Sequence, residues 1–193
     1  MEESASCAAF AATDFPALPV RAVGVIRNAV AKPMLKTDDH GISLDTCMEE
    51  MRQHIREIKT AVSEIIIHEE LLELLDGIDD YSHLVVLYWG HQVPESGRLL
   101  TRVHPMGRKE FPKVGIFGTR SPARPNPVLM TTVRLKGREG NVLRVTGLDA
   151  INNSPVIDIK PHVPERDSQG EVRMPGWMAR IQEEIAAGDA RDD

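Results

Sequence analysis

A proline-rich stretch, IFGTRSPARPNPVLM at residues 116–130, carries basic side chains on a stiff backbone. Each proline fixes its own φ angle and pushes the residue before it out of the helical region. Arg120 and Arg124 offer planar forks that suit a carboxylate or a phosphate. Because a rigid loop loses little entropy on binding, the stretch predicts an anion-binding loop, which also presents Ser121 and Asn126. The alternative is that the arginines tie the loop to strand edges through backbone carbonyls.

A second stretch, GLDAINNSPVIDIKPH at residues 147–162, combines a turn with acidic and basic side chains. Asp149 precedes the turn, while Asp158 and Lys160 lie two positions apart and share one face of the following strand. An acid and a base in an apolar run predict a buried or cleft-lining ion pair, which is as often structural as catalytic. All three are candidates for proton transfer. The turn consists of Asn152, Asn153, Ser154 and Pro155.

A third group of polar residues ends the apolar run LVVLYWG. His91 and Gln92 follow this run and place an imidazole and an amide at the mouth of a predicted barrel. A lone histidine is more often structural than functional, so the position alone favours a structural role. The seven histidines show no close pairing typical of metal ligands, and we expect no metal site.

Short strands must position these three groups. Residues 20–28 alternate apolar and other side chains, and a strand follows from His83 to Gly90. Five more short apolar runs, separated by Gly, Pro and Asn turns, occupy residues 98–161, with a hairpin tip at Gly140-Asn141. Many short strands with little helix between them predict an antiparallel or mixed β-barrel with α additions, not a doubly wound sheet. We expect a short helix from Trp177 to Ala187 near the acidic C-terminal tail.

The clearest predicted helix runs from Ser43 to Val62, after a predicted loop at residues 31–41. Ser43 or Asp45 is available as its N-cap. Methionine fills irregular gaps well, so we favour a core-facing stripe over a partner-binding face. The stripe, at helical spacing, consists of Leu44, Met48, Met51, Ile55, Ile58 and Val62.

Composition bounds the class of protein. With 193 residues, 41% apolar and 27% charged, the chain fits one globular domain. We expect residues 1–18 to be a flexible lead-in, 19–165 the barrel domain, and 166–193 a helix with its tail. No apolar run approaches the length of about 18 residues that a membrane span needs. The N-terminus lacks the features of a secretory signal, so we expect a cytoplasmic protein.

Charge and motif content narrow the function. The net charge is −6, yet residues 98–124 hold seven basic side chains against Glu110 alone. A local basic patch on an acidic body suits a bounded anionic ligand, or is a solvated face. Dinucleotide, P-loop, zinc-protease and α/β-hydrolase motifs are all missing from the sequence.

Four segments together resemble the TrmO/TsaA-like family, the S-adenosylmethionine-dependent methyltransferases of N6-threonylcarbamoyladenosine in tRNA. They are GVIRN, IDDYSHLVVLYWGHQ, HPMGRKEFPKVGIFGTRSPARPNPV and GLDAINNSPVIDIKPHVP, and the resemblance extends from about Val20 to Pro164. It implies a β-barrel methyltransferase that works as a homodimer on the anticodon loop of tRNA, with S-adenosylmethionine near the subunit interface. The cofactor-contacting positions carried over are His91, Gln92, Arg120, Met130, Asn152, Asn153, Ser154 and Pro155.

The chain departs from the family pattern in several places, which include the Asn-Asn-Ser-Pro turn and His162. The helix at 43–62 is an insertion relative to shorter members, and residues 31–41 lack the family's Gln-Pro-Gly-like cofactor element. The acceptor of a divergent member can differ from that of the family. We therefore keep two alternatives: a methyltransferase of another acceptor, and a non-catalytic S-adenosylmethionine-binding or partner-binding module. A barrel-facing helix stripe favours the enzyme, and a solvent-exposed stripe favours the module.

Overall fold

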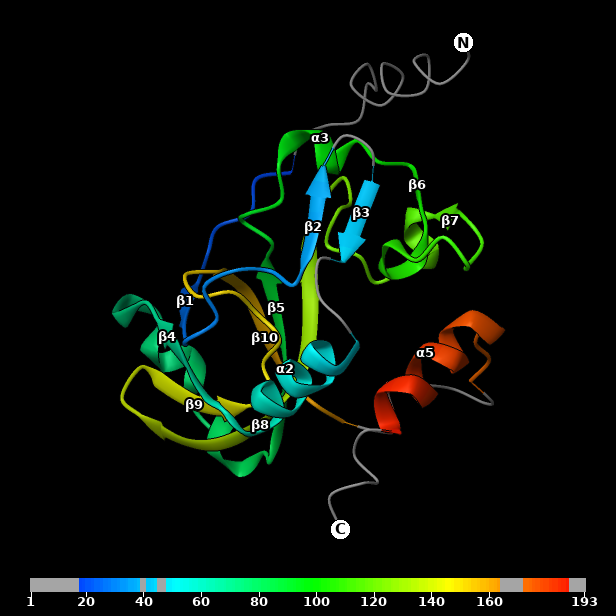
Figure 1. Ribbon diagram of the computed structural model, residues 1–193. Helices are drawn as coiled ribbons and strands as arrows, with labels where there is room; N and C mark the ends of the chain where they lie inside the picture. Colours follow the sequence, from blue (N-terminus) through cyan, green and yellow to red (C-terminus); the bar gives the residue numbers. More distant parts are fainter. Residues whose placement is uncertain (1–17, 39–40, 45–47, 164–171, 188–193) are drawn as a thin grey trace.

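Six strands form a closed antiparallel barrel in the computed structural model, which describes residues 18–38, 41–44, 48–163 and 172–187 (Figure 1). Around the barrel the strand order is β1-β10-β5-β8-β9-β4. The predicted fold class, mainly β with few helices, is confirmed. The barrel strands are β1 (Gly24–Arg27), β4 (Val62–Ile67), β5 (His83–Trp89), β8 (Val128–Glu139), β9 (Val142–Thr146) and β10 (Pro155–Pro161).

Alternating side chains build the barrel core. Strand β5, HLVVLYW, buries every second residue, because successive side chains of a strand point to opposite faces. Each fully buried Leu, Ile or Val contributes about 1.5–3 kcal/mol relative to an exposed one. The side chains with no exposed surface include Ile26, Ile65, Leu84, Val86, Leu143, Val145 and Val156.

The strand register brings the chemically interesting segments to one end of the barrel. Trp89, at the end of β5, pairs with Val128, at the start of β8. Tyr88 lies opposite Val156 of β10, and Val25 of β1 pairs with Pro155. We call this end, where β1 and β5 finish and β8 and β10 begin, the site end.

Residues 31–41 contain strand structure where the sequence predicted a loop. Strand β2 (Leu35–Asp38) pairs with β3 (Gly41–Leu44) as an antiparallel hairpin, and residues 39–40 between them lie outside the description. Four-residue strands are too short for a clear period of two, which explains the wrong prediction. The hairpin stands above the barrel in Figure 1, and its strand β3 packs against Gly107. A Cβ on Gly107 would lie 2.4 Å from the Ile42 carbonyl oxygen, so this close approach requires glycine.

The predicted helix at 43–62 is shorter in the structure. Helix α2 spans Met48–Thr60, Ser43 belongs to β3, and Val62 begins β4 with 55% of its surface exposed. Met51 is buried, and Ile55 and Ile58 are half-buried, so the stripe faces the body of the protein. The Ile58 carbonyl accepts a 3.1 Å hydrogen bond from the backbone N–H of Gly147, just after β9. Helix α2 is thereby fixed at the site end, as a core-facing helix.

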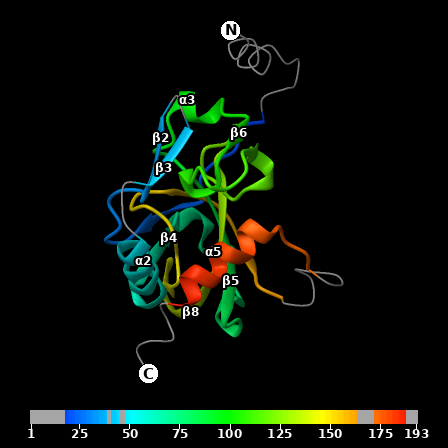
Figure 2. The same cartoon turned by 45° about the vertical axis from the view of Figure 1, so that its right-hand side comes forward.

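Helix α5 (Gly176–Ala186) confirms the predicted C-terminal helix and is tied to α2. The Arg52 Nε of α2 donates a 2.8 Å hydrogen bond to the Glu184 carbonyl oxygen. The Glu184 carboxylate accepts hydrogen bonds from Arg108 and, at 2.8 Å, from Arg180. Both cartoon views place α5 on the side of the molecule that carries α2 (Figure 2). Glu184 therefore joins two helices and the loop that holds Arg108.

Glu184→Gln should destabilise the fold. The Arg108 hydrogen bond lowers the pKa of Glu184 to about 2. This carboxylate therefore contributes stability above its ordinary pKa of about 4.3, and the contribution is lost as the pH falls toward 2. At pH 7 we expect the variant to lose about 1–2 kcal/mol of unfolding free energy. Its unfolding free energy should also fall less than that of the wild type as the pH drops from about 4.3 toward 2. Chemical unfolding across pH measures both effects. The exposed neighbour Glu183→Gln is the control, and equal stability of the two variants would contradict the bridging role.

The remaining elements connect the barrel strands. They are η1 (Glu69–Leu75), η2 (Ile78–Asp80), α3 (Glu95–Arg98), β6 (Arg102–Val103), η3 (Pro105–Gly107), β7 (Val114–Gly115) and η4 (Ile116–Gly118).

Within the described residues no helix is long and apolar enough to cross a bilayer, and no three His, Cys, Asp or Glu side chains gather as metal ligands. The predicted lead-in lies outside the description apart from residue 18, as do the helix positions 45–47 and the segments 164–171 and 188–193.

Candidate functional site

The end of β5 meets the turn before β10. His91 Nδ1 lies 3.2 Å from the Ser154 hydroxyl oxygen, and Ser154 is buried. The two predicted residues are 63 positions apart in the sequence, and only the pairing of β5 with β10 brings them together. The serine holds the half-buried imidazole at the site end, while Gln92 beside it is exposed.

The Asn-Asn turn is pinned by a residue that the sequence analysis did not select. Asn28 donates its backbone N–H to the Asn152 side-chain oxygen at 3.2 Å and its side-chain amide to the Ala150 carbonyl at 2.9 Å. Asn153 adopts a φ of 68°, a left-handed conformation that asparagine tolerates, and its side chain is exposed. Asn152 thus serves the turn itself, whereas Asn153 is presented to solvent. An asparagine at the end of a strand was the available signal for Asn28.

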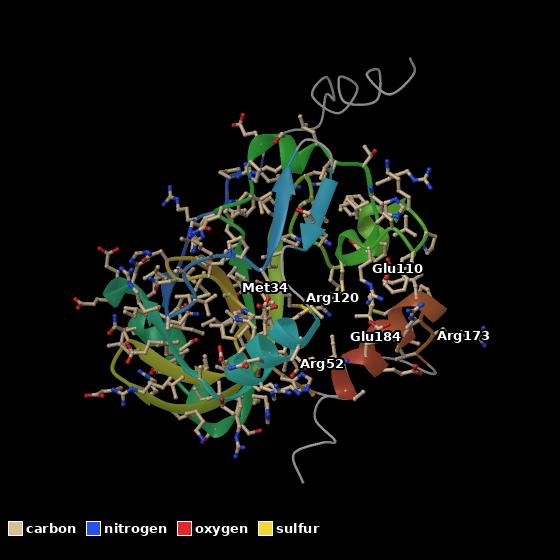
Figure 3. All side chains as sticks on the ribbon, in the orientation of Figure 1. Met34, Arg52, Glu110, Arg120, Arg173 and Glu184 are labelled. Carbon is tan, nitrogen blue, oxygen red and sulfur yellow. The ribbon has the colours of Figure 1, made fainter. Side chains whose placement is uncertain are left out.

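The two arginines of the proline-rich loop have different roles. Arg124 donates 2.7 and 2.8 Å hydrogen bonds to the Ser121 and Thr119 carbonyl oxygens, which is the structural role that the sequence analysis left open. Arg120 donates one 3.0 Å hydrogen bond to the Met130 carbonyl and remains exposed. Figure 3 shows Arg120 in the middle of the view, between the β2–β3 hairpin above and α2 below. Arg120 is therefore the arginine available to a ligand.

Hydrogen bonds hold the loop at its Pro127 end and within its middle part. The Gly90 N–H at the end of β5 donates a 2.8 Å hydrogen bond to the Pro127 carbonyl. A Cβ on Gly90 would lie 3.3 Å from the Pro127 side chain, which shows how closely the loop packs there. The Ser121 hydroxyl accepts a 3.2 Å hydrogen bond from the Ala123 N–H, and Asn126 is exposed. Ser121 thus shapes the loop, and Asn126 faces solvent.

Tyr88 lies at the centre of the site end. Its hydroxyl donates to the Asp149 carbonyl oxygen and lies 3.2 Å from the Thr131 hydroxyl, which must be the donor there because the phenol has one proton. Burial raises the pKa of Tyr88 to about 12, and both Asp149 and Arg120 influence it electrostatically. A phenol with this pKa stays protonated at physiological pH. Tyr88 therefore joins the residue before the Asn-Asn turn to the start of β8.

Tyr88→Phe should loosen the site end while leaving most of the fold intact. The change leaves the Asp149 carbonyl without its donor, and a lost buried hydrogen bond costs about 1–3 kcal/mol. We expect a lower free energy of unfolding by that amount, because the backbone of Asp149 is released. Denaturant titration measures the effect. Thr131→Val, which removes only the second partner, is the milder control; unchanged stability in Tyr88→Phe would exclude this positioning role.

Asp149 combines exposure with an unusual environment. The residue is accessible to solvent, yet desolvation by the surrounding protein raises the pKa of its carboxyl. His54 of α2 lowers that pKa in turn through its charge. A carboxyl with a raised pKa that water and ligands can reach is suited to accept a proton. Helix α2 therefore brings a titratable group to the same end of the barrel.

Asp158 and Lys160 form a surface ion pair, and the prediction of a buried or cleft-lining pair is wrong. Their charged atoms are 2.5 Å apart, with 43% and 62% of the respective side chains exposed. A bulge between Val156 and Asp158 shifts the register and turns both residues toward solvent. Lys160 pairs with Val85 near the start of β5, away from the site end.

The same strand pairing brings two histidines together at the opposite end of the barrel. The rings of His83 and His162 stand 6.3 Å apart in an edge-to-face arrangement. The sequence analysis expected no close histidine pairing, because the two residues are distant along the chain.

Comparisons with known protein families agree with this geometry. The family model "tRNA-methyltransferase O N-terminal domain" matches residues 47–168, a range that includes α2. A "Probable S-adenosyl-L-methionine-binding protein" of Pyrococcus abyssi is 40% identical over 124 residues, which cover 64% of this chain and 63% of that protein. A protein of the same description from Methanothermobacter thermautotrophicus is 49% identical over 108 residues, covering 56% of this chain and 74% of the relative.

More distant relatives are a human enzyme and solved bacterial structures. The human "tRNA (adenine(37)-N6)-methyltransferase" is 38% identical over 103 residues, which are 52% of this chain and 22% of that protein. The crystal structure of TrmO from Pseudomonas aeruginosa superimposes with a TM-score of 0.59 at 25% identity and covers 85% of this chain and 63% of its own. The chain thus spans somewhat under two thirds of the Pyrococcus relative and of this solved structure.

Proposed function

The chain belongs to the tRNA-methyltransferase O (TrmO) family, and from this membership we propose that it is an S-adenosylmethionine-dependent methyltransferase of tRNA. Its proposed acceptor is the N6 nitrogen of threonylcarbamoyladenosine next to the anticodon. The observation that carries the proposal is that Tyr88 links Asp149 and Arg120 at the site end: its hydroxyl bonds the Asp149 carbonyl and Thr131, and Arg120 bonds the carbonyl of Met130, next to Thr131. A cation suited to the donor and a carboxyl suited to a proton thereby face one region of the molecule.

The residues of the site end fit S-adenosylmethionine. Arg120 is exposed on a rigid loop, and its fork matches the carboxylate of the methionine part. Around it stand neutral hydrogen-bonding groups that suit ribose hydroxyls and adenine nitrogens. Residues 31–41, which include most of the β2–β3 hairpin, lack the Gln-Pro-Gly-like element of the family, so we assign no cofactor contact there. The proposed contacts are His91, Gln92, Met130, Asn152, Asn153, Ser154 and Pro155.

The reaction needs alignment and one proton acceptor. S-adenosylmethionine, when bound, supplies a methyl group on a positively charged sulfur. Transfer of this methyl group to the acceptor nitrogen would be an in-line displacement that leaves the sulfur neutral. In this displacement the protein mainly holds the two groups in line. The proton leaving the nitrogen goes to the Asp149 carboxylate, whose raised pKa favours its uptake.

Two of the candidates for proton transfer, Asp158 and Lys160, are less suited to this role than Asp149. Asp158 and Lys160 neutralise each other on the surface, and Lys160 pairs with Val85, away from the site end. His91 is held by Ser154 and is better placed to contact the donor than to take the proton. Asp149 is therefore the proposed proton acceptor.

The proposal includes a homodimer, as the family resemblance implies, with the donor near the subunit interface. Sedimentation at micromolar concentration, with and without S-adenosylmethionine, tests this state. A monomer under both conditions that still methylates tRNA would contradict it.

Transfer of labelled methyl to tRNA tests the proposed function. Total tRNA with and without threonylcarbamoylation is incubated with the protein and labelled S-adenosylmethionine, and nucleosides are analysed by mass. We expect label on threonylcarbamoyladenosine alone. Label on another nucleoside would replace the acceptor. Donor binding without label in either pool would refute the tRNA methyltransferase.

A further inference from the structure

Phe117 is an aromatic side chain that the fold leaves in solvent. It exposes 79% of its surface, whereas Tyr88 and Phe111 are buried. Among the aromatic residues that the structure describes, Tyr81 is the other exposed one, at 43%. Tyr81 precedes β5 and follows the acidic pair Asp79 and Asp80, at the end of the barrel away from the site. An exposed phenyl ring forgoes the free energy that burial would give. Phe117 therefore has no role in the core of this chain.

The backbone around Phe117 is fixed. Ile116 before it is buried, and its N–H donates a 2.9 Å hydrogen bond to the Thr101 carbonyl. Thr119 closes the turn, since its N–H and hydroxyl donate 3.1 and 2.8 Å hydrogen bonds to the Ile116 carbonyl. A Cβ added at Gly118 would meet nothing within 4 Å, so the chain next to Phe117 is uncovered too. The ring therefore stands on a rigid turn, three residues before Arg120.

Exposed cations surround this turn. Arg102 pairs with Gly115 across β6 and β7 and donates a 2.8 Å hydrogen bond to the carbonyl of Lys113, the residue just before β7. Three other basic residues of segment 98–124 have internal contacts: Arg98 lies over the Trp89 ring, Arg108 pairs with Glu110 and Glu184, and Arg124 bonds the loop. Arg120 is assigned to the donor. Ion pairs found in the described part of the chain involve none of the remaining three exposed residues, Arg102, Lys109 and Lys113, which we call the basic face.

We propose that Phe117 is the platform on which an unpaired base of the substrate RNA stacks, with the basic face holding the phosphates of the same strand. The inference rests on the proposed function and adds the residue that positions the RNA. Aromatic rings bind any base through its face, and Lys and Arg beside them neutralise the backbone. An exposed ring next to cations fits this combination. Being three residues from Arg120, the ring orders RNA beside the donor.

A second copy of this chain fits the surface less well. A two-fold contact through Phe117 would place each basic face against the other, because such an interface meets itself. Like charges placed together oppose association. An RNA strand supplies both the flat apolar face for the ring and the negative charge for the cations.

Equilibrium binding of threonylcarbamoylated tRNA to Phe117→Ala tests the proposal. A lost base stack should weaken tRNA binding by about 10- to 100-fold, while the salt dependence of binding stays the same because the ring carries no charge. Lys113→Ala should instead reduce the salt slope by about one unit, as expected for one phosphate contact. Phe117→Trp, which keeps a stacking surface, should restore binding. Tyr81→Ala is the matched control, an exposed ring in acidic surroundings that should not change tRNA affinity.

Several outcomes would overturn the inference. Equal tRNA affinity in Phe117→Ala and the wild type, with the wild type active, would remove the platform and leave the proposed function intact. Conversion of the Phe117→Ala variant from dimer to monomer in sedimentation would make the ring an interface residue. A wild-type chain that neither binds nor methylates tRNA would refute the proposed function and this inference with it. Calorimetry with S-adenosylmethionine on each variant is the control for folding: an unchanged donor affinity shows that the fold and the donor site persist.

Discussion

Arg120→Ala is expected to bind S-adenosylmethionine about 10- to 100-fold more weakly than the wild-type chain, with little change in stability. A charged hydrogen bond to a ligand is worth about 1.5–3 kcal/mol. The side chain is exposed and donates a single bond to a strand carbonyl, so its loss removes little from the fold. Calorimetric titration gives the affinity, and thermal unfolding of the free protein gives the stability.

The controls for Arg120 separate charge from geometry. Arg120→Lys keeps the positive charge without the planar fork, and we expect affinity between those of the wild type and Arg120→Ala. Arg134→Ala removes an exposed arginine from the middle of β8, where that strand pairs with His83 at the start of β5. Donor affinity should not change there. Unchanged affinity in Arg120→Ala would remove this residue from the site.

Asp149→Asn should lower the methyl-transfer rate by about 10²- to 10⁴-fold, the usual contribution of a positioned proton acceptor. The amide occupies nearly the same volume but cannot take the proton. Donor binding should persist, because the Tyr88 hydroxyl bonds the backbone carbonyl of this residue and not its carboxyl. Single-turnover assays with bound donor measure the rate. Asp158→Asn, in the surface pair, is the control with an unchanged rate.

The pH dependence gives a second test of Asp149. The carboxylate form is the proposed proton acceptor, so activity should rise with pH through the raised pKa of this group and reach a plateau above it. His54→Ala removes a positive charge that lowers this pKa, so the rise should move to higher pH. A rise that stays in place in both His54→Ala and Asp149→Asn would assign the titration to another group.

The raised pKa of Asp149 predicts a pH dependence of the unfolding free energy that is opposite in sign to the one expected for Glu184. The folded state holds the Asp149 proton more tightly than the unfolded chain, so this group stabilises the fold at low pH. Its contribution is lost as the pH rises from the ordinary aspartate value of about 3.9 to the raised value. Asp149→Asn should remove that loss and should not destabilise the protein at neutral pH.

Periodic segments of the sequence were read correctly because their signal is local. Strand β5 alternates over seven residues, and the hairpin of β8 and β9 turns at Gly140, whose φ is 59°. The barrel follows from such strands, since a closed sheet leaves no unpaired edge. Helix α5 was also predicted to within one residue at each end.

Predictions failed at residues where a helix meets a neighbouring strand. The predicted helix included Ser43 and Val62, although strand pairing places these residues in β3 and β4. Their spacing on one strand predicted that Asp158 and Lys160 form a buried or cleft-lining pair. In the structure a β-bulge precedes them and the pair is exposed. Helical or alternating spacing says which side chains share a face, but only packing decides which face is buried.

The sequence by itself determined the barrel, the stiff arginine-bearing loop, the Asn-Asn turn and the resemblance to one family. These depend on short-range chemistry: proline geometry, turn-forming residues and alternation. Tertiary structure decided the roles within the site. It assigned Arg124 to the loop and left Arg120 exposed, placed Tyr88 between Arg120 and Asp149, and brought His54 from α2 to the same end. Such assignments depend on which strands pair and on local desolvation, and both arise only when distant segments pack together.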